Sequence, residues 1–582
     1  MKIPLVGASY QEDSLPFNAE RSINLYPVLD QQGKEVSALY GTPGLKPFTT
    51  CGIGPIREEF YSATGRAFCI SGTTLYEFYA DGTTTSRGTI KQSSGNIYFS
   101  ENTTQLGVCD GTNLYILTYS SNNFEQIVGG LEYSTNGSFA SDTGWTKGSG
   151  WSITGGHAAA SSASTALSQN AAYTIVSGRT YTVTYTVASL SAGTVTASVG
   201  GTAGTARSAN GTYTDTIVAG STQVLAFTGS GFTGNISAVS VQGPENGFPN
   251  NIGTLTVMDG FFIVNVNLTK QFYKSALNDG TSWNALDYAS KESSPDYLKR
   301  VIRAFGQLCL LGDETTEVWY DSGASSFPFQ RLVGAIMQQG IYAPASAQEI
   351  DNSLMWLGKN IEGYGVVFRA TGFYPQRIST TPIELLIGQA TDPTNIKSYK
   401  YQRNGHLFYI LTGGGLPTSL VYDVTTQMWH ERAYLNNGIY ETAKPFCCVA
   451  AFGHLIVGDK DNNNLYYLDE ETYDDNGDPL SSERIFTHLS QEDMRVRYNR
   501  LVIYFESGVG TQTGQGQNPV AELWASKDGG RTWLGGYTAS IGAAGAFQTK
   551  AAWRQLGVAE TMTFKVRITD PVKRRLIGAY LS

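Results

Sequence analysis

Residues 407–424, LFYILTGGGLPTSLVYDV, contain the pattern that decides the fold: an apolar run, a polar glycine-rich turn, and a second apolar run with tyrosine. Each run has the length of a buried β-strand, and the turn between them suits a hairpin. The same two-strand phrase recurs roughly every 40 to 50 residues, a period typical of β-propeller blades. Its seven copies begin at Arg66, Leu106, Phe261, Leu308, Leu354, Leu407 and Leu455.

The composition agrees with an all-β chain. With 582 residues, the chain exceeds the size at which one hydrophobic core keeps growing, and a closed array of blades meets that limit. Glycine (66), tyrosine (34) and phenylalanine (26) are abundant, whereas only 15% of the residues are charged. Strands and tight turns favour this composition.

A segment of different composition interrupts the repeats between residues 134 and 242. Its 109 residues hold three basic and two acidic side chains among Ser, Thr, Ala and Gly. Residues 180–187, TYTVTYTV, alternate as a half-buried strand does, and short Gly-containing turns follow, which predicts a small jelly-roll-like β-sandwich. Removing these residues restores the repeat period, so we interpret them as an insertion, with hinges at 129–130 and 243–247.

After about residue 490 the phrase stops and longer apolar strands follow, which predicts a C-terminal antiparallel sheet module. Residues 292–305 are compatible with one short helix or with a loop and a strand. The predicted organisation is an N-terminal segment with the first blades (1–133), the inserted sandwich (134–242), the remaining blades (243–490) and the C-terminal module (491–582).

The charge and cysteine content exclude several classes of protein. A net charge of −9 argues against a protein that grips nucleic acid phosphates. The one dense basic run, Lys573 to Arg575, is interpreted as a solubilising device on an edge strand. The six cysteines lack metal-like spacing, which predicts buried, reduced thiols in a chain folded in a reducing cytoplasm. We expect no signal peptide and no membrane span, because no window approaches 18 apolar residues.

The sharpest local motif is the Asp-box S-x-D-x-G-x-T-W, formed by Ser526, Asp528, Gly530, Thr532 and Trp533. Asp-boxes occur in sialidase propellers, but their residue types have a structural explanation. The aspartate binds turn amides, the glycine tolerates positive φ, and the tryptophan packs under the hairpin. We therefore interpret the box as a structural turn.

No other motif supports catalysis, a metal or a cofactor. Residues 474–478, DDNGD, could hold Ca²⁺ but lack the EF-hand spacing, so a solvated loop is favoured. The five histidines are spread singly in the sequence, without a partner at zinc-ligand spacing. Trp145 and Trp151 in the insertion are candidates for stacking on a glycan, and the alternative is that both fill the sandwich core.

Several phrases resemble the tail nozzle, or packaged-DNA stabilisation, proteins of short-tailed phages. The resemblance covers roughly residues 15–130 and 245–582, and the insertion departs from it. The phrases are RSINLYPV (21–28), ALYGTPGL (38–45), TEVWYDSGASSFPFQRLVGA (316–335), WLGKNIEGYGVVFRATGFYPQRIST (356–380), WASKDGGRTW (524–533) and DPVKRRLIGA (570–579).

The resemblance implies a structural virion protein of the podovirus tail that assembles in the host cytoplasm. It implies a homo-oligomer, a hexameric ring below the portal and adaptor, that retains the packaged genome and conducts it during ejection. The implied partners are the tail adaptor protein, a tail fibre, tailspike or needle protein, and double-stranded DNA passing without tight binding. Six copies would carry about −54 charges, which repel phosphate and suit a channel through which DNA slides.

Two alternatives from other classes remain open at this point. The first is a propeller glycosidase or sialidase of a phage tail, which would release sugar from host polysaccharide. The second is a glycan-binding adhesin that contacts the host through the insertion.

Overall fold

The computed structural model describes residues 2–29, 37–127, 132–169, 171, 175–222, 225–243, 247–491 and 494–582. The chain forms two compact units. One comprises Met1–Gln126, Asn251–Phe272 and Ala289–Ser582, and the other comprises Ile127–Asn250 and Tyr273–Tyr288. Nearly all of the regular structure is β-strand, so the predicted all-β class is confirmed.

The propeller has seven four-stranded blades among the described residues, and the predicted β-propeller is confirmed. All seven copies of the two-strand repeat fall on the two middle strands of a blade, which are largely buried. Blades one to three consist of β6 (Ile56–Tyr61), β7 (Ala67–Ser71), β8 (Thr74–Phe78) and β9 (Thr84–Thr89); β10 (Tyr98–Glu101), β11 (Gln105–Cys109), β12 (Leu114–Thr118) and β13 (Asn123–Ile127); and β22 (Ile252–Met258), β23 (Phe261–Val266), β24 (Gln271–Ala276) and β25 (Asp279–Ser290).

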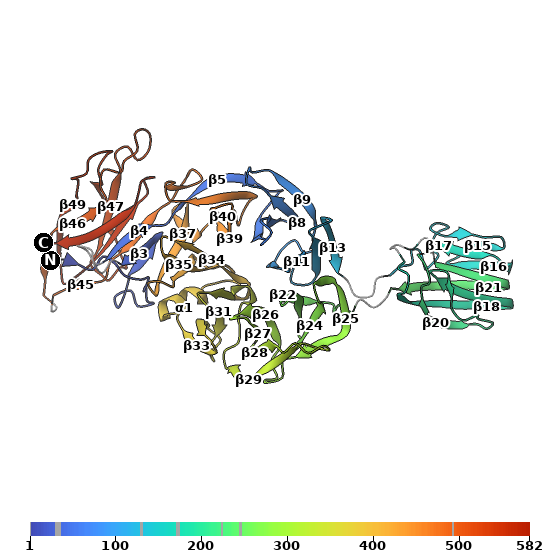
Figure 1. Ribbon diagram of the computed structural model, residues 1–582. Helices are drawn as coiled ribbons and strands as arrows, with labels where there is room; N and C mark the ends of the chain where they lie inside the picture. Colours follow the sequence, from blue (N-terminus) through green and yellow to red (C-terminus); the bar gives the residue numbers. More distant parts are fainter. Residues whose placement is uncertain are drawn as a thin grey trace. The chain divides into compact units, whose positions relative to one another are not determined.

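The later blades follow the same plan, and colours run in sequence order from blue to orange around this unit in Figure 1. Blades four to six consist of β26 (Leu298–Ala304), β27 (Gln307–Gly312), β28 (Thr316–Asp321) and β29 (Phe329–Met337); β30 (Gln348–Ile350), β31 (Ser353–Lys359), β32 (Gly365–Thr371) and β33 (Tyr374–Arg377); and β34 (Ile396–Arg403), β35 (His406–Gly413), β36 (Ser419–Asp423) and β37 (Met428–Asn436).

Blade seven closes the ring with a strand from the opposite end of the chain. β39 (Pro445–Ala451), β40 (His454–Asp459) and β41 (Asn464–Asp469) are followed in the sheet by β5 (Gly44–Thr50), which pairs antiparallel with β41. Apolar clusters then join blade seven to blade one, for example through Cys447 and Cys69, and blade six to blade seven, through Phe408 and Val457. Other apolar clusters join blade one to blade two, three to four, four to five and five to six.

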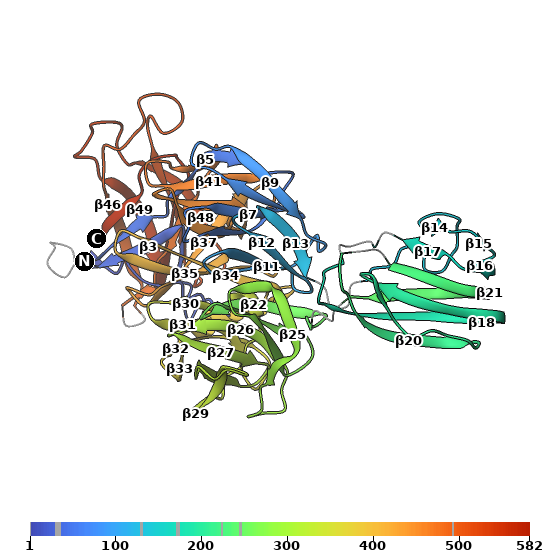
Figure 2. The same ribbon diagram turned by 45° about the vertical axis from the view of Figure 1, so that its right-hand side comes forward.

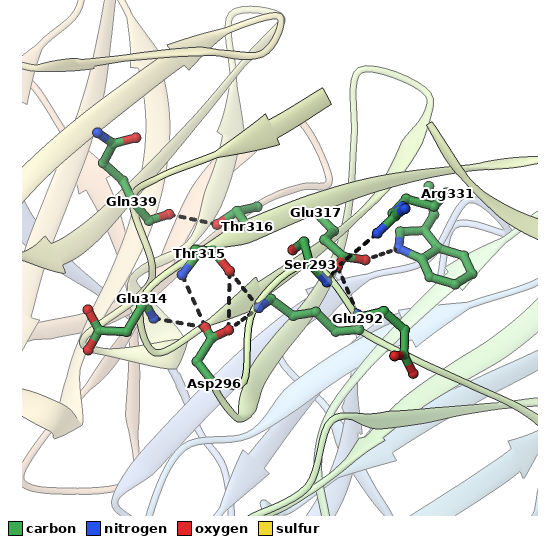
Figure 3. A network of polar contacts seen from close by, with 11 residues as sticks. Glu292, Ser293, Asp296, Glu314, Thr315, Thr316, Glu317, Arg331 and Gln339 are labelled. Carbon is green, nitrogen blue, oxygen red and sulfur yellow. Dashed lines mark hydrogen bonds and ion pairs between the residues drawn. The ribbon is translucent and has the colours of Figure 1, made fainter. Parts of the chain in front are cut away.

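The region predicted as a helix or a loop and strand, residues 292–305, is a loop followed by β26. Figure 3 shows the polar network that holds the loop. Buried Lys291 forms an ion pair with Asp296 and donates to the Thr315 hydroxyl at 2.6 Å, and the Glu317 carboxylate accepts from the backbone amide of Glu292 at 2.9 Å. These tertiary contacts fix an extended path. The helices of the described residues lie elsewhere: α1 (Thr381–Gly388) and the 3₁₀ turns η1 (Pro344–Ser346) and η2 (Pro393–Asn395).

The C-terminal module is a sandwich of two sheets around its own core, and it includes the N-terminal strands. Both chain ends meet there, because Lys2 pairs with Tyr580, and the N and C marks lie together in Figures 1 and 2. One sheet holds β1 (Lys2–Ile3), β3 (Leu25–Leu29), β4 (Ser37–Gly41), β46 (Val496–Phe505), β49 (Ala551–Ala559) and β51 (Arg575–Leu581); the other holds β2 (Arg21–Ile23), β44 (Ser482–Ile485), β45 (Leu489–Ser490), β47 (Val520–Ser526), β48 (Leu534–Ser540) and β50 (Thr561–Ile568).

The second unit contains a small sandwich with its own apolar core. The long strands β18 (Thr180–Val199) and β21 (Leu225–Gln242) pair along most of their length, with register shifts. The hinge residues expected at 129–130 and 244–246 lie outside the described residues. The strands are β14 (Thr146–Lys147), β15 (Trp151–Thr154), β16 (His157–Ala163), β17 (Ala166–Gln169), β18 (Thr180–Val199), β19 (Thr202–Ala203), β20 (Gly211–Val218) and β21 (Leu225–Gln242).

Candidate functional site: the propeller axis and the propeller–sandwich junction

The first strands of six blades line a cavity of about 880 Å³ within the first unit. Its charged groups are of both signs. Arg300 lies 4.2 Å from the centroid of the Tyr98 ring, and its Nε and Nη1 have no hydrogen-bond partner among the described residues. Burial raises the pKa of Glu59 well above its ordinary value, which favours the neutral form of this carboxyl. The cavity is therefore polar without a strong charge of one sign.

The junction between the propeller and the sandwich is built on β2. This strand lies between β37 of blade six and β44 of the sandwich, and it pairs parallel with the first and antiparallel with the second. The blade and the sandwich thereby share one continuous sheet of eleven strands. β2 shares one residue pair with β37 and three with β44, so backbone pairing connects the two modules.

Buried polar side chains reinforce this junction. Glu431 of β37 accepts two hydrogen bonds from Arg21, at 2.8 and 2.6 Å, and one from the Thr418 hydroxyl at 2.7 Å. Asn24, in the left-handed region at φ +53°, donates to the carbonyls of Ala433 and Ser481 at 2.8 and 2.7 Å. The phrase RSINLYPV thus supplies the residues that join the modules.

Arg484 performs a similar role for the N-terminal segment. Its fully buried guanidinium forms an ion pair with Glu20 and donates to the carbonyl of Leu5 at 2.9 Å. The sequence contained no signal for these contacts, because the partners lie more than 450 residues apart. Only the fold brings them together.

The Asp-box closes the turn between β47 and β48. Asp528 accepts from the Ser526 hydroxyl at 2.7 Å and from the Thr532 amide and hydroxyl at 2.9 and 2.5 Å, and these hydrogen bonds hold the pKa of its carboxyl well below the ordinary value. Gly530 has φ +94°, and Trp533 is partly exposed with Lys565 Nζ 4.7 Å from its ring centroid. The hydrogen bonds of Asp528 stay within the hairpin and explain the Ser, Asp and Thr of the box by local structure.

Trp145 and Trp151 lie in the core of the inserted sandwich. Each is 7% exposed, and their indole nitrogens donate to the carbonyls of Asn136 and Thr165 at 3.2 and 3.0 Å. A ring that stacks on a sugar needs an exposed face. The glycan contact considered for these two residues is therefore wrong, and both fill the sandwich core, as the alternative states.

Two other interpretations of charged segments are also corrected. Within residues 573–575, Arg574 is only 2% exposed and cannot act as a solubilising surface charge, while Lys573 and Arg575 both bind Glu506. The acidic residues 474–478 form a hairpin, β42 (Asp474–Asp475) and β43 (Asp478–Pro479), whose Asp475 is buried rather than solvated. Both interpretations fail because tertiary contacts bury these residues: Arg574 donates to the carbonyl of Leu480, and Asp475 pairs with Leu45 of β5.

The histidines are not all isolated in space. His406 binds Asp423 at 2.7 Å, and both His406 and His430 contact the Tyr26 ring. Within the described residues no group of three or more His, Cys, Asp or Glu side chains is placed to hold a metal ion. All six cysteines are described and are free thiols. In the part of the chain that the structure covers, no helix is long and apolar enough to cross a bilayer.

The first unit is thus a propeller closed by an N-terminal strand and joined to a sandwich through a shared sheet. Two family models match the chain: "Bacteriophage P22 Gp10, beta-propeller" over residues 1–161 and 135–473, and "Bacteriophage P22 Gp10, beta-sandwich" over residues 482–582. The chain belongs to the family of bacteriophage P22 Gp10 and is a phage tail structural protein, so the resemblance noted from its sequence is confirmed.

Other comparisons add no functional argument. No curated protein matches the chain. Similar solved structures include the N-terminal domain of Nup159 (7% identity, 80% of this chain, 98% of that chain, TM-score 0.33), the WD40 domain of SCAP from fission yeast (8%, 73%, 97%, 0.29) and an exo-β-1,3-galactanase from Phanerochaete chrysosporium (8%, 57%, 82%, 0.18). Because every one of these TM-scores is below 0.5, the likenesses carry no weight.

Proposed function

We propose that this protein is the tail nozzle of a podovirus virion, assembled in the host cytoplasm as a hexameric ring. The ring lies below the portal and its adaptor, meets a tail fibre, tailspike or needle protein, retains the packaged genome and conducts it during ejection. The observation that carries the proposal is the match of both modules, propeller and sandwich, to one family of phage tail proteins.

The size of the propeller cavity supports a channel between copies rather than within one. B-form DNA has a major groove alone about 12 Å wide and 8.5 Å deep, so a duplex does not fit a cavity of about 880 Å³. A conduit for DNA therefore requires several copies arranged about an axis. The net charge of −9 per copy favours passage over retention by phosphate contacts.

The junction supports a mechanical role. A ring that withstands the pressure of packaged DNA needs modules that do not rotate against one another, and the shared sheet with its buried ion pairs meets that need. Assembly and closure, rather than catalysis, are then the activity of the protein.

Electron microscopy of the purified chain tests the proposal. We expect rings with six-fold symmetry and an axial opening wide enough for a duplex, and co-purification with portal and adaptor when these are co-expressed. Virions made without the protein should lose their DNA. A monomer that stays monomeric with portal and adaptor contradicts the proposal, and release of sugar from host polysaccharide would favour the glycosidase alternative.

A further inference from the structure

A small pocket of about 50 Å³ lies beside the junction, under the end of the basic run. Its walls come from residues 40–43, from the turn between β34 and β35, from the segment after β41, and from residues 573–575. Four basic and two acidic side chains line it: Arg403, Lys573, Arg574, Arg575, Glu470 and Glu471. Arg403 pairs with Glu470, and Lys573 and Arg575 pair with Glu506, whereas Arg574 forms no ion pair among the described residues.

Arg574 lines this pocket, and two of its three guanidinium nitrogens lack a hydrogen-bond partner among the described residues. The side chain is 2% exposed, and Nη1 donates to the carbonyls of Leu480 and Tyr473 at 2.5 and 3.4 Å. Its Nε and Nη2 have no hydrogen-bond partner among the described residues. These two nitrogens form the edge of a guanidinium that binds carboxylate or phosphate oxygens in pairs.

Other buried polar groups in or next to this pocket also lack hydrogen-bond partners among the described residues. The hydroxyl of Thr42, another residue of the pocket wall, is 4% exposed and lacks a partner within the described chain. Pro43 accepts from Nη2 of buried Arg432, whose Nη1 is also unpaired there. Leaving buried donors without acceptors is costly, and such groups usually have an unobserved water or ion as partner.

The unpaired guanidinium edge of Arg574 favours an anion over a cation. Asp475 is the acidic residue that acts most strongly on Arg574, but no ion pair joins the two within the described residues, and Asp475 also faces Arg432 and Lys444. Burial, outweighing these three basic groups, raises the pKa of Asp475 to about 6, so this carboxyl stays mostly charged at neutral pH. Its Oδ1 atom also lacks a hydrogen-bond partner among the described residues, so Asp475 does not satisfy the free edge of Arg574.

We propose that this pocket binds one small oxyanion, gripped by Nε and Nη2 of Arg574 and by the hydroxyl of Thr42. The volume would hold only a few waters at about 10–15 Å³ each, so a free phosphate-like ion fits, whereas a phosphate of duplex DNA does not. The ion would compensate the charge where residues 40–43, blade six and the sandwich meet. This site is independent of the nozzle proposal, which stands if the site is empty.

Calorimetric titration of the full chain with inorganic phosphate, against chloride at equal ionic strength, tests this assignment. We expect saturable binding by the natural protein and a rise in the melting temperature of about 2 °C at 100 times Kd, given the length of the chain. Arg574→Lys keeps the charge but loses the paired donors, and should weaken binding at least about tenfold. Arg554→Lys, an exposed arginine of β49, is the matched control and should leave binding unchanged.

Two further variants keep the test decisive if Arg574→Lys does not fold. Thr42→Val should weaken phosphate binding by a few-fold, and Asp475→Asn should strengthen it because a buried negative charge is removed. Identical responses to phosphate and chloride in the natural protein overturn the proposal, as does weaker binding by Asp475→Asn. Competition by a short DNA duplex at equal ionic strength would overturn the assignment to a free ion.

Discussion

The guanidinium of Arg21 and the carboxylate of Glu431 meet across 410 residues of sequence, with Nε–Oε1 and Nη2–Oε2 distances of 2.8 and 2.6 Å. Glu431 is 1% exposed, and its burial alone would raise the pKa of its carboxyl. The charge of Arg21 and its hydrogen bonds outweigh burial and lower that pKa instead. The pair therefore holds a charged carboxylate inside the propeller–sandwich junction.

Loss of Arg21 should destabilise the junction strongly. Arg21→Ala leaves Glu431 buried without its partner, which we expect to cost about 3–5 kcal/mol of unfolding free energy. Urea unfolding followed by tryptophan fluorescence measures the change. Arg495→Ala removes an exposed arginine 4.0 Å from Glu560 and should have no measurable effect, since exposed pairs contribute little. Equal losses in both variants would contradict this role of Arg21.

Closure of the ring by β5 predicts a second, local effect. Leu45 is fully buried in the core shared by blades six and seven, so Leu45→Ala should cost about 2–5 kcal/mol. Hydrogen exchange should accelerate first in β41, the partner of β5, because that strand loses its outer neighbour. Leu534→Ala, at an exposed position of β48, is the control. Exchange that accelerates evenly in all blades would argue against closure by this strand.

The repeating phrase predicted the middle strands of the blades because they are buried on both faces and carry a continuous apolar signal. The contribution of β1–β4 to the sandwich was not predictable in this way. Their partners are at the other end of the chain, and short strands such as β2 have no periodic pattern of their own. Likewise, nothing in residues 573–575 distinguishes the buried Arg574 from its partly exposed neighbours.

The candidate sites show the same difference between contacts that are local in the sequence and contacts made by tertiary packing. Local contacts, such as those of Asp528 within its turn, follow from residue spacing. Burial does not: Trp145 and Asp475 lie in segments whose local composition is that of exposed loops, and tertiary packing encloses both. The unpaired groups around Arg574 come from segments more than 100 residues apart, so only the fold reveals them.

Acidification should weaken the junction through His430. Burial lowers the pKa of this imidazole from 6.5 to about 4, with Asp423 opposing the change and His406 and Arg432 adding to it. The pKa is lower in the folded state, so the neutral imidazole of His430 contributes to the unfolding free energy fully above pH 6.5. This contribution, about 3 kcal/mol in total, is lost as the pH falls from 6.5 through 4.

Unfolding free energies at pH 7.5 and 4.5 measure this contribution as a difference between variants. His430→Gln should show a smaller loss on acidification than the natural protein, whereas His454→Gln, at an exposed position, should not differ from it. The comparison must be between variants, because the raised pKa of Asp475 acts in the opposite direction over the same range. An unchanged pH dependence in His430→Gln would refute the prediction.

The inserted sandwich should be removable without loss of the propeller. Its two ends lie side by side: Glu132 bridges to Gln242, and the Glu132 carboxylate accepts from the amide of Val241 at 2.7 Å. Insertions whose ends are close and whose core is separate are tolerated because few contacts cross their boundary. A variant that joins Tyr133 to Gly243 through a short Gly-Ser linker should therefore fold and assemble as the full chain does, as judged by its melting temperature and by electron microscopy.

Deleting blade four, residues 298–337, removes fewer residues but should abolish folding, because it removes the cores that blade four shares with blades three and five. Aggregation of the first variant would show that the insertion supports the propeller, whereas normal assembly with failed adsorption to the host would assign it an adhesive role.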